Sequence, residues 1–157
     1  MTHRPVLTST SIVFLLATTL AGCEVTAKTT ERYEAEPQTE ELDYQSGTDL
    51  FIDARNGTIN VEPGESGVVR VTFTPFTYRG YDEDDQAQAE MENSLTARAE
   101  LTDAGIEVAT LKEGGGSSSL GADIVVELPP EFDAGLFIDQ GNGDVDINTV
   151  GEAVELV

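Results

Sequence analysis

The sequence has no tryptophan, one histidine and one cysteine among its 157 residues. The histidine is His3 and the cysteine is Cys23, so both lie close to the amino terminus. The rest of the chain has no imidazole to act as a general base, no thiol nucleophile, and no histidine or cysteine to ligate a metal. We therefore expect the protein not to be an enzyme and to need no cofactor.

Positive charge is also scarce. Lys and Arg number 8 against 30 Asp and Glu, which gives a net charge of −22. Nucleic acid is not an expected partner, because a basic surface is needed to neutralise its phosphates. The acid excess instead predicts a strongly hydrated surface.

The first 22 residues are typical of an export signal. His3 and Arg4 give a short positive start, and a mostly apolar run follows over residues 12–20. This run is too short to span a bilayer, which takes about 20 apolar residues, and it suits a secretory signal peptide. The next residues, Leu20-Ala21-Gly22-Cys23, resemble a bacterial lipobox. The alternative is an ordinary signal peptide with a cysteine at this place by chance.

The resemblance to a lipobox implies that Cys23 is lipidated and becomes the first residue of the mature chain. A single cysteine in an exported protein cannot form an internal disulfide, whereas a lipid thioether accounts for its presence. The membrane is then a partner through the lipid anchor. Glu24 follows Cys23, and not the Asp that favours inner-membrane retention, so we expect an outer-membrane protein of the cell envelope.

Residues 23–45 are polar and acidic and lack the apolar density of a core. They predict an extended, solvated tether between the lipid and a folded domain over residues 46–157. In an alternative interpretation, Tyr33, Leu42 and Tyr44 begin a first strand.

One unit of the sequence occurs twice. Residues 50–61, LFIDARNGTINV, return as residues 136–147, LFIDQGNGDVDI, at an offset of 86 (136 − 50) with no gap. Each copy alternates apolar and polar residues on both sides of an Asn-Gly pair, which predicts a strand, a corner and a second strand. The pairs at 56–57 and 142–143 suit a two-residue hairpin turn, and they also suit the corner of a β-solenoid. Alternation alone leaves both folds open.

The repeated pattern N-G-x-I-x-V, with an intervening V-x-L-P, resembles the adhesin-type bacterial β-solenoid domains known as DUF4097. The matching stretches are residues 56–61, 126–129 and 142–145. The resemblance covers residues 49–157 and implies an all-β, solenoid-like domain in a cell-envelope setting, without an activity. The alternative fold is an antiparallel β-sandwich of hairpins.

Such domains usually carry further Asn-Gly units, whereas this chain stops just after its second copy. An uncovered apolar strand exposes unpaired backbone groups, and a solenoid needs a terminal cap. We therefore expect the domain to be incomplete at Val157 and the reading frame to continue with at least one more unit. If the frame ends there, we expect self-association through the strand at 154–157.

Between the two copies the sequence predicts several further elements. A helix is expected over residues 86–93, which are rich in Ala, Glu and Met. The acidic run at 82–85 and the Gly-Ser run at 113–119 are expected to be solvated loops. Strands are expected over residues 68–76, 95–101, 106–111 and 122–128.

Three functional hypotheses follow. The first is a non-catalytic structural or interaction module with an envelope protein or glycan as ligand. The second is a calcium-dependent binding module, because oxygen donors gather around the second corner and calcium accepts carboxylate and carbonyl ligands. The third and most remote is a glycan-cleaving enzyme that uses paired carboxylates. The donors proposed for calcium are Asp139, Asn142, Asp144 and Asp146.

Overall fold

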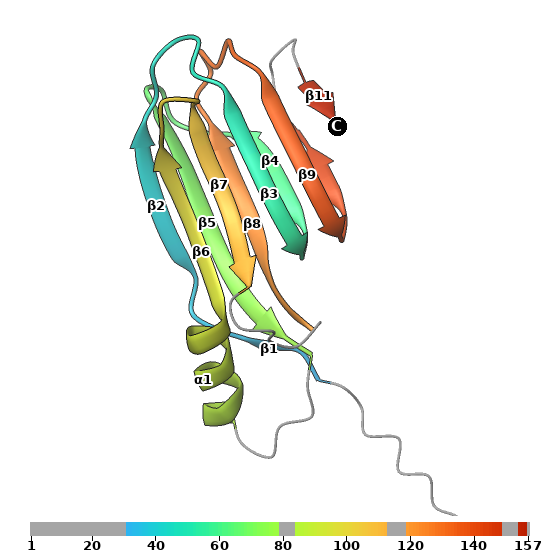
Figure 1. The fold of residues 1–157 in the computed structure, drawn as a ribbon. Helices are drawn as coiled ribbons and strands as arrows, with labels where there is room; N and C mark the ends of the chain where they lie inside the picture. The colour runs from blue at the N-terminus through green and yellow to red at the C-terminus, as the bar shows by residue number, and fades with distance from the viewer. Residues whose placement is uncertain (1–30, 79–83, 113–118, 149–153, 157) are drawn as a thin grey trace, which may run out of the picture.

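The computed structural model describes residues 31–78, 84–112, 119–148 and 154–156. The chain forms two β-sheets that lie one on the other, with a short helix at one end (Figure 1). This agrees with the predicted all-β class and with a helix near residues 86–93. In the described ranges, no helix has the length and apolar character that a membrane span requires.

The six-stranded sheet has the order β1-β5-β8-β4-β10, and β2 also pairs with β5. The strands β1, β2 and β8 run antiparallel to β5, whereas β4 is parallel to both β8 and β10. Its members are β1 (Tyr33–Glu34), β2 (Gln38–Asp43), β4 (Ile59–Pro63), β5 (Val68–Thr77), β8 (Leu120–Leu128) and β10 (Val145–Ile147).

The five-stranded sheet has the order β11-β9-β3-β7-β6. All of its pairings are parallel except that of β6 with β7. The helix α1 (Asp84–Ser94) connects β5 to β6 along the chain. The strands are β3 (Leu50–Asn56), β6 (Leu95–Leu101), β7 (Ile106–Lys112), β9 (Leu136–Asn142) and β11 (Val154–Leu156).

The two copies of the repeated unit lie side by side. The strands β3 and β9 pair in parallel from Leu50↔Leu136 to Asn56↔Asn142, and β4 pairs with β10 from Ile59↔Val145. The sequence offset of 86 is therefore also the register of both pairings. Each copy contributes one strand to each sheet.

The Asn-Gly pairs turn the chain from one sheet into the other, so the hairpin interpretation of these two corners is wrong. A two-residue hairpin of type I′ needs positive φ at both residues. Only the glycines have it, with φ of 127° at Gly57 and 134° at Gly143. A Cβ at Gly143 would lie 1.8 Å from the carbonyl oxygen of Gly57, so the corners stack too closely for a side chain.

Apolar side chains from both sheets meet between them, as the period of two predicts. Burying each of the larger ones stabilises the fold by about 1.5–3 kcal/mol. Those with less than 2% exposure include Leu50, Ile59, Val61, Val71, Phe73, Ile106, Ile124 and Leu136.

The chain enters the six-stranded sheet inside the segment predicted to be a tether. The strand β2 pairs with β5 from Gln38↔Phe73 to Asp43↔Val68, and Tyr44 is buried. This segment has a polar sequence because β2 leaves one face in water, where Thr39, Glu41 and Asp43 are exposed. Strands are therefore already present at Tyr33–Glu34 and Gln38–Asp43, inside the predicted tether and before residue 46, as the first-strand alternative suggested.

The loop before β9 fastens the end of the molecule opposite the corners. The Asp133 carboxylate accepts hydrogen bonds from the Tyr44 and Ser46 hydroxyls, both at 2.6 Å, and from the Gly47 N–H at 2.8 Å. The hydroxyl of Ser46, then that of Tyr44, then the Gly47 N–H lower the pKa of Asp133 to about 2. Glu131 likewise accepts from the Ser66 hydroxyl at 2.8 Å.

Candidate functional site

The outward side of the five-stranded sheet carries aromatic side chains. The Phe51 and Phe137 rings stack with their centroids 5.0 Å apart and an interplanar angle of 11°. The next outward residues, Asp53 and Asp139, are also register partners, because outward positions recur every second residue. We call the outward residues Phe51, Asp53, Glu107, Leu111, Phe137 and Asp139 the aromatic face.

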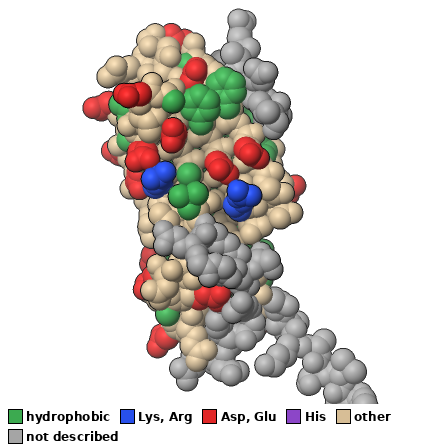
Figure 2. Space-filling view, in the orientation of Figure 1, with side chains coloured by type: hydrophobic (Ala, Val, Ile, Leu, Met, Phe, Trp, Pro, Cys, Tyr) green, Lys and Arg blue, Asp and Glu red, His purple; other side chains and the backbone are tan. Residues whose placement is uncertain are grey.

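A shallow groove of about 620 Å³ runs along the aromatic face. Arg98 of β6 and Ala104 of the β6–β7 turn also contribute to its walls. The two phenylalanines are half-buried and Leu111 is 42% exposed. Figure 2 shows hydrophobic side chains gathered near one end of this side of the molecule, with acidic side chains around them. The groove therefore offers apolar contact area with charged groups beside it.

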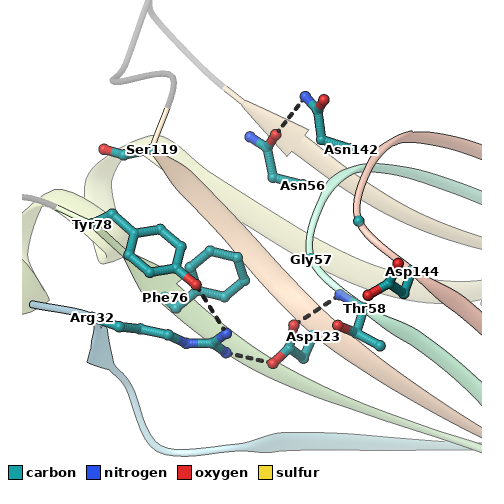
Figure 3. Close-up of a pocket in the computed structure, with 11 residues that line it drawn as sticks. Arg32, Asn56, Gly57, Thr58, Phe76, Tyr78, Ser119, Asp123, Asn142 and Asp144 are labelled. Carbon is teal, nitrogen blue, oxygen red and sulfur yellow. Dashed lines mark hydrogen bonds and ion pairs between the residues drawn. The ribbon is translucent and has the colours of Figure 1, made fainter. Parts of the chain in front are cut away.

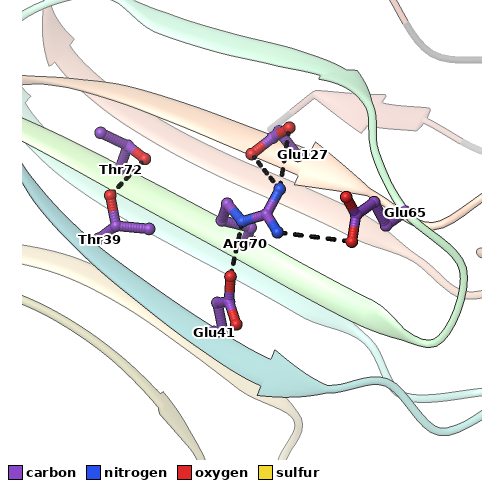
Figure 4. A network of polar contacts seen from close by, with 6 residues as sticks. All are labelled: Thr39, Glu41, Glu65, Arg70, Thr72 and Glu127. Atoms are coloured by element: carbon purple, nitrogen blue, oxygen red, sulfur yellow. Dashed lines mark hydrogen bonds and ion pairs between the residues drawn. The ribbon is translucent and has the colours of Figure 1, made fainter.

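The outward side of the six-stranded sheet differs, because Arg70 joins several of its acids within the chain (Figure 4). Arg70 lies 2.8 Å from Glu41, 3.2 Å from Glu127 and 3.6 Å from Glu65. The hydrogen bonds that the Arg70 guanidinium donates to Glu41 and then to Glu127 raise the pKa of Arg70. On the aromatic face, no ion pair joins Asp53 or Asp139 to another described residue.

A second, smaller hollow of about 270 Å³ lies at the Asn-Gly corners (Figure 3). The Arg32 guanidinium lies 4.0 Å from the centroid of the Phe76 ring and donates a hydrogen bond to Asp123. Asp123 also accepts the Thr58 N–H at 2.8 Å. These contacts occupy the polar groups on one wall of the hollow. The hollow therefore serves chiefly to hold Arg32, near the first described residue, against the sheet.

The asparagines of the two corners also stack. The Asn142 side-chain amide donates to the Asn56 side-chain oxygen at 3.1 Å, and the Asn56 amide donates to the Leu120 carbonyl at 2.7 Å. Asn142 is one of the residues proposed for calcium, and its side-chain NH2 group joins neighbouring copies of the repeat.

The structure separates the other proposed calcium ligands. Asp139 lies on β9 in the groove of the five-stranded sheet, and Asp144 lines the corner hollow. Asp146 lies on β10 of the six-stranded sheet. Among the described residues no group of three or more His, Cys, Asp or Glu is arranged to hold a metal ion. The geometry therefore does not favour calcium at these four residues.

Two further predictions concern residues near the two ends of the sequence. Cys23, the proposed lipid site, lies outside them. The predicted terminal strand is present as β11, which pairs with β9 from Val154↔Leu136 to Leu156↔Ile138.

Sequence reasoning did not identify the aromatic face or Arg32. The signal for the face was present, because the repeat offset aligns Phe51 with Phe137 and Asp53 with Asp139. It becomes informative only once the copies are known to pair in parallel. Nothing local marks Arg32, whose partner Asp123 is 91 residues away.

Comparison with known proteins identifies no family. No protein-family model matches the sequence, and no curated protein matches it. Among solved structures, a "putative cell adhesion protein" from Clostridium sporogenes aligns with 77% of this chain and 57% of its own, at 13% identity and a TM-score of 0.48.

A "putative adhesin" from Parabacteroides merdae and another from Parabacteroides distasonis each align with 67% of this chain, at 10% identity and a TM-score of 0.32. The chain spans 39% and 40% of those two proteins. At this level of likeness, the function of the chain has to be inferred from its own residues.

Proposed function

We propose that the protein is a lipid-anchored, non-catalytic interaction module of the cell envelope, and that the aromatic face is its contact surface. One observation carries this proposal: stacked phenylalanines and a half-exposed leucine line a groove on an outward sheet face. Exposed apolar surface rimmed by polar groups is typical of interaction sites. Aromatic side chains are enriched in the contact areas of protein interfaces.

The proposal includes a short β-solenoid. In support, the chain passes from β9 through β10 in the other sheet and returns as β11, parallel to β9 and beside it. The strands β3 and β4 form the equivalent part of the neighbouring coil. On the side of that coil away from β9 and β10, β7 pairs in parallel with β3 and β8 pairs in parallel with β4. Stacked Phe and Asn side chains then join successive coils, as identical side chains do in stacked parallel strands.

The proposed anchor has a limited reach. Arg32 is nine residues after Cys23 (32 − 23), and an extended chain covers at most about 3.6 Å per residue, or about 32 Å. Because Arg32 is fastened at the corner end, a lipid on Cys23 would keep that end close to the bilayer. The strands of the aromatic face would then extend away from the bilayer, where an envelope partner can reach the face.

Site-specific photo-crosslinking in cells that produce the full chain tests the proposal. A photoreactive phenylalanine analogue in place of Phe137 should give a crosslinked adduct with an envelope component. The same analogue in place of Thr72, on the outward side of the other sheet, is the matched control and should give none. Absence of an adduct at 137, or equal adducts at both positions, would remove the aromatic face as the contact surface.

A further inference from the structure

The charges beside the stacked phenylalanines indicate what kind of partner fits the aromatic face. Asp53 and Asp139 are exposed and lie directly opposite each other on neighbouring parallel strands. Such strands are spaced about 4.8 Å apart. Like charges opposite each other on neighbouring strands destabilise a sheet. Glu107 is the register partner of Phe51 on the other side, so it adds a third carboxylate to the groove.

No cation of the described part of the chain forms an ion pair with this acidic pair. Arg32 and Arg70 are engaged with acids elsewhere, and Arg98 lies 3.1 Å from Glu100. Arg55 is exposed two residues from Asp53 on the same side of β3, and no ion pair joins it to Asp53 or Asp139. Register also places Arg98 two strands away from Asp53, with Ala109 between them. No cation of the described residues is thus paired with Asp53 or Asp139, so the position between these two carboxylates is open to a cation of a partner.

A second copy of the chain does not suit this role, because its net charge is −22. Two such copies repel each other, and an anionic polymer is repelled in the same way. Charge complementarity favours a basic partner, whose cations would be drawn to the groove before contact.

The spacing along β3 and β9 adds a constraint. Phe51 and Asp53 lie on the same side of β3 and are two residues apart, which is about 6.6 Å in a parallel strand. Phe137 and Asp139 repeat this spacing on β9. An extended peptide places side chains i and i+2 on one side at the same distance. It can therefore set an apolar side chain on the rings and a cation on the carboxylates.

We propose that the aromatic face binds an extended polypeptide segment that carries Lys or Arg two residues from an apolar side chain. The cation lies between Asp53 and Asp139, and the apolar side chain packs against Phe51 and Phe137. This inference rests on the proposed function and names the class of its partner.

The test uses the full chain in detergent micelles and a fluorescently labelled eight-residue peptide. The peptide has lysine and phenylalanine two residues apart among threonines, and a matched peptide has glutamate in place of lysine. We expect the lysine peptide to bind, and added salt to weaken its binding. The double variant Asp53→Asn/Asp139→Asn should raise its dissociation constant at least about fivefold, because exposed ion pairs are individually weak.

The control variant is Asp146→Asn, which removes an exposed acid from the opposite sheet and should leave the affinity unchanged. Equal binding of the glutamate peptide, or no effect of the double variant, overturns the inference. Binding of cellohexaose in place of the lysine peptide overturns it in favour of a neutral glycan. If crosslinking at position 137 succeeds and the peptide tests fail, the contact surface stands and only the partner class is wrong.

Discussion

The Phe51 and Phe137 rings are 86 residues apart in the sequence (137 − 51) and stack at 5.0 Å. Aromatic pairs of this kind contribute about 0.5–1.5 kcal/mol beyond the area they bury. The stack joins neighbouring copies of the repeat and also forms the apolar part of the aromatic face. Its two roles are separable by experiment.

The stability role is tested by a double-mutant cycle with Phe51→Ala and Phe137→Ala. We expect a coupling free energy of about 0.5–1.5 kcal/mol from urea unfolding of the four proteins. Phe51→Ala combined with Tyr78→Ala is the control, because Tyr78 lies at the corner hollow and should not couple. Additive effects for both pairs would mean that the rings do not stack in solution.

The corner geometry predicts a strong effect of a single methyl group. Gly143→Ala places a Cβ 1.8 Å from the Gly57 carbonyl oxygen at a φ of 134°. We expect a loss of about 3 kcal/mol or more, because strain at this φ and a backbone clash add together. Gly67→Ala is the control, since its φ of 80° is also positive but nothing lies within 4 Å of the added Cβ. Its cost should be about 1 kcal/mol. Similar midpoints for the two variants would contradict the stacked corners.

The Asp133 carboxylate predicts a pH dependence of stability. Its pKa falls from the ordinary 3.8 to about 2 in the folded state, because the Ser46 and Tyr44 hydroxyls and the Gly47 N–H donate to it. A lowered carboxyl pKa stabilises the fold above the unfolded-state value. This contribution should be fully present above about pH 4.8 and lost as the pH falls through 3.8 towards 2.

Thermal unfolding between pH 6 and pH 2 checks this expectation. The stability difference between wild type and Asp133→Asn should shrink as the solution becomes more acidic. Ser46→Ala removes the leading donor and so brings the folded-state pKa of Asp133 closer to 3.8. Its loss of stability on acidification should therefore be smaller and should level off at a higher pH than in the wild type. A constant difference across the whole range would show that the donors do not act on Asp133.

The Arg32 contacts predict that the first described residues help to hold the fold. The guanidinium is partly buried, lies over the Phe76 ring and pairs with Asp123. We expect Arg32→Ala to cost about 1–3 kcal/mol, since a ring contact is lost and Asp123 loses its cation. Arg98→Ala is the matched control, because its partner Glu100 is 46% exposed and such pairs contribute little, below about 1 kcal/mol. Equal unfolding midpoints would indicate that Arg32 does not fasten the segment.

Much of the fold could be predicted from the sequence, because most strands keep one face in the core. The alternation around Ile52, Val71 and Ile124 correctly indicated strands with buried apolar sides. The strand β2 was harder to find, because its sequence QTEELD places only Leu42 as an apolar residue towards the core. Its position depends on pairing with β5, which a local pattern does not contain.

The corners and the site depended on information that a local pattern lacks. Asn-Gly suits several turns, and only the pairing partners of β3 and β4 decide between a hairpin and a corner. The calcium hypothesis grouped Asp139, Asp144 and Asp146 because they are close in sequence. Alternation and the corner place them on different sides of the molecule.

The most direct test is a disulfide between β3 and β9, because the proposed contact surface exists only if the two copies pair in parallel and in register. Register partners on neighbouring strands lie within the Cα separation of about 4.4–6.8 Å that a disulfide allows. Asp53→Cys/Asp139→Cys is made in the full chain with Cys23→Ser, oxidised under mild conditions and mapped by peptide mass spectrometry. In-register pairing of the two copies predicts efficient linkage of residues 53 and 139, and none for Asp53→Cys/Asp146→Cys, whose residues lie in different sheets. Failure of the first pair to link, or equal linkage of both pairs, would contradict it.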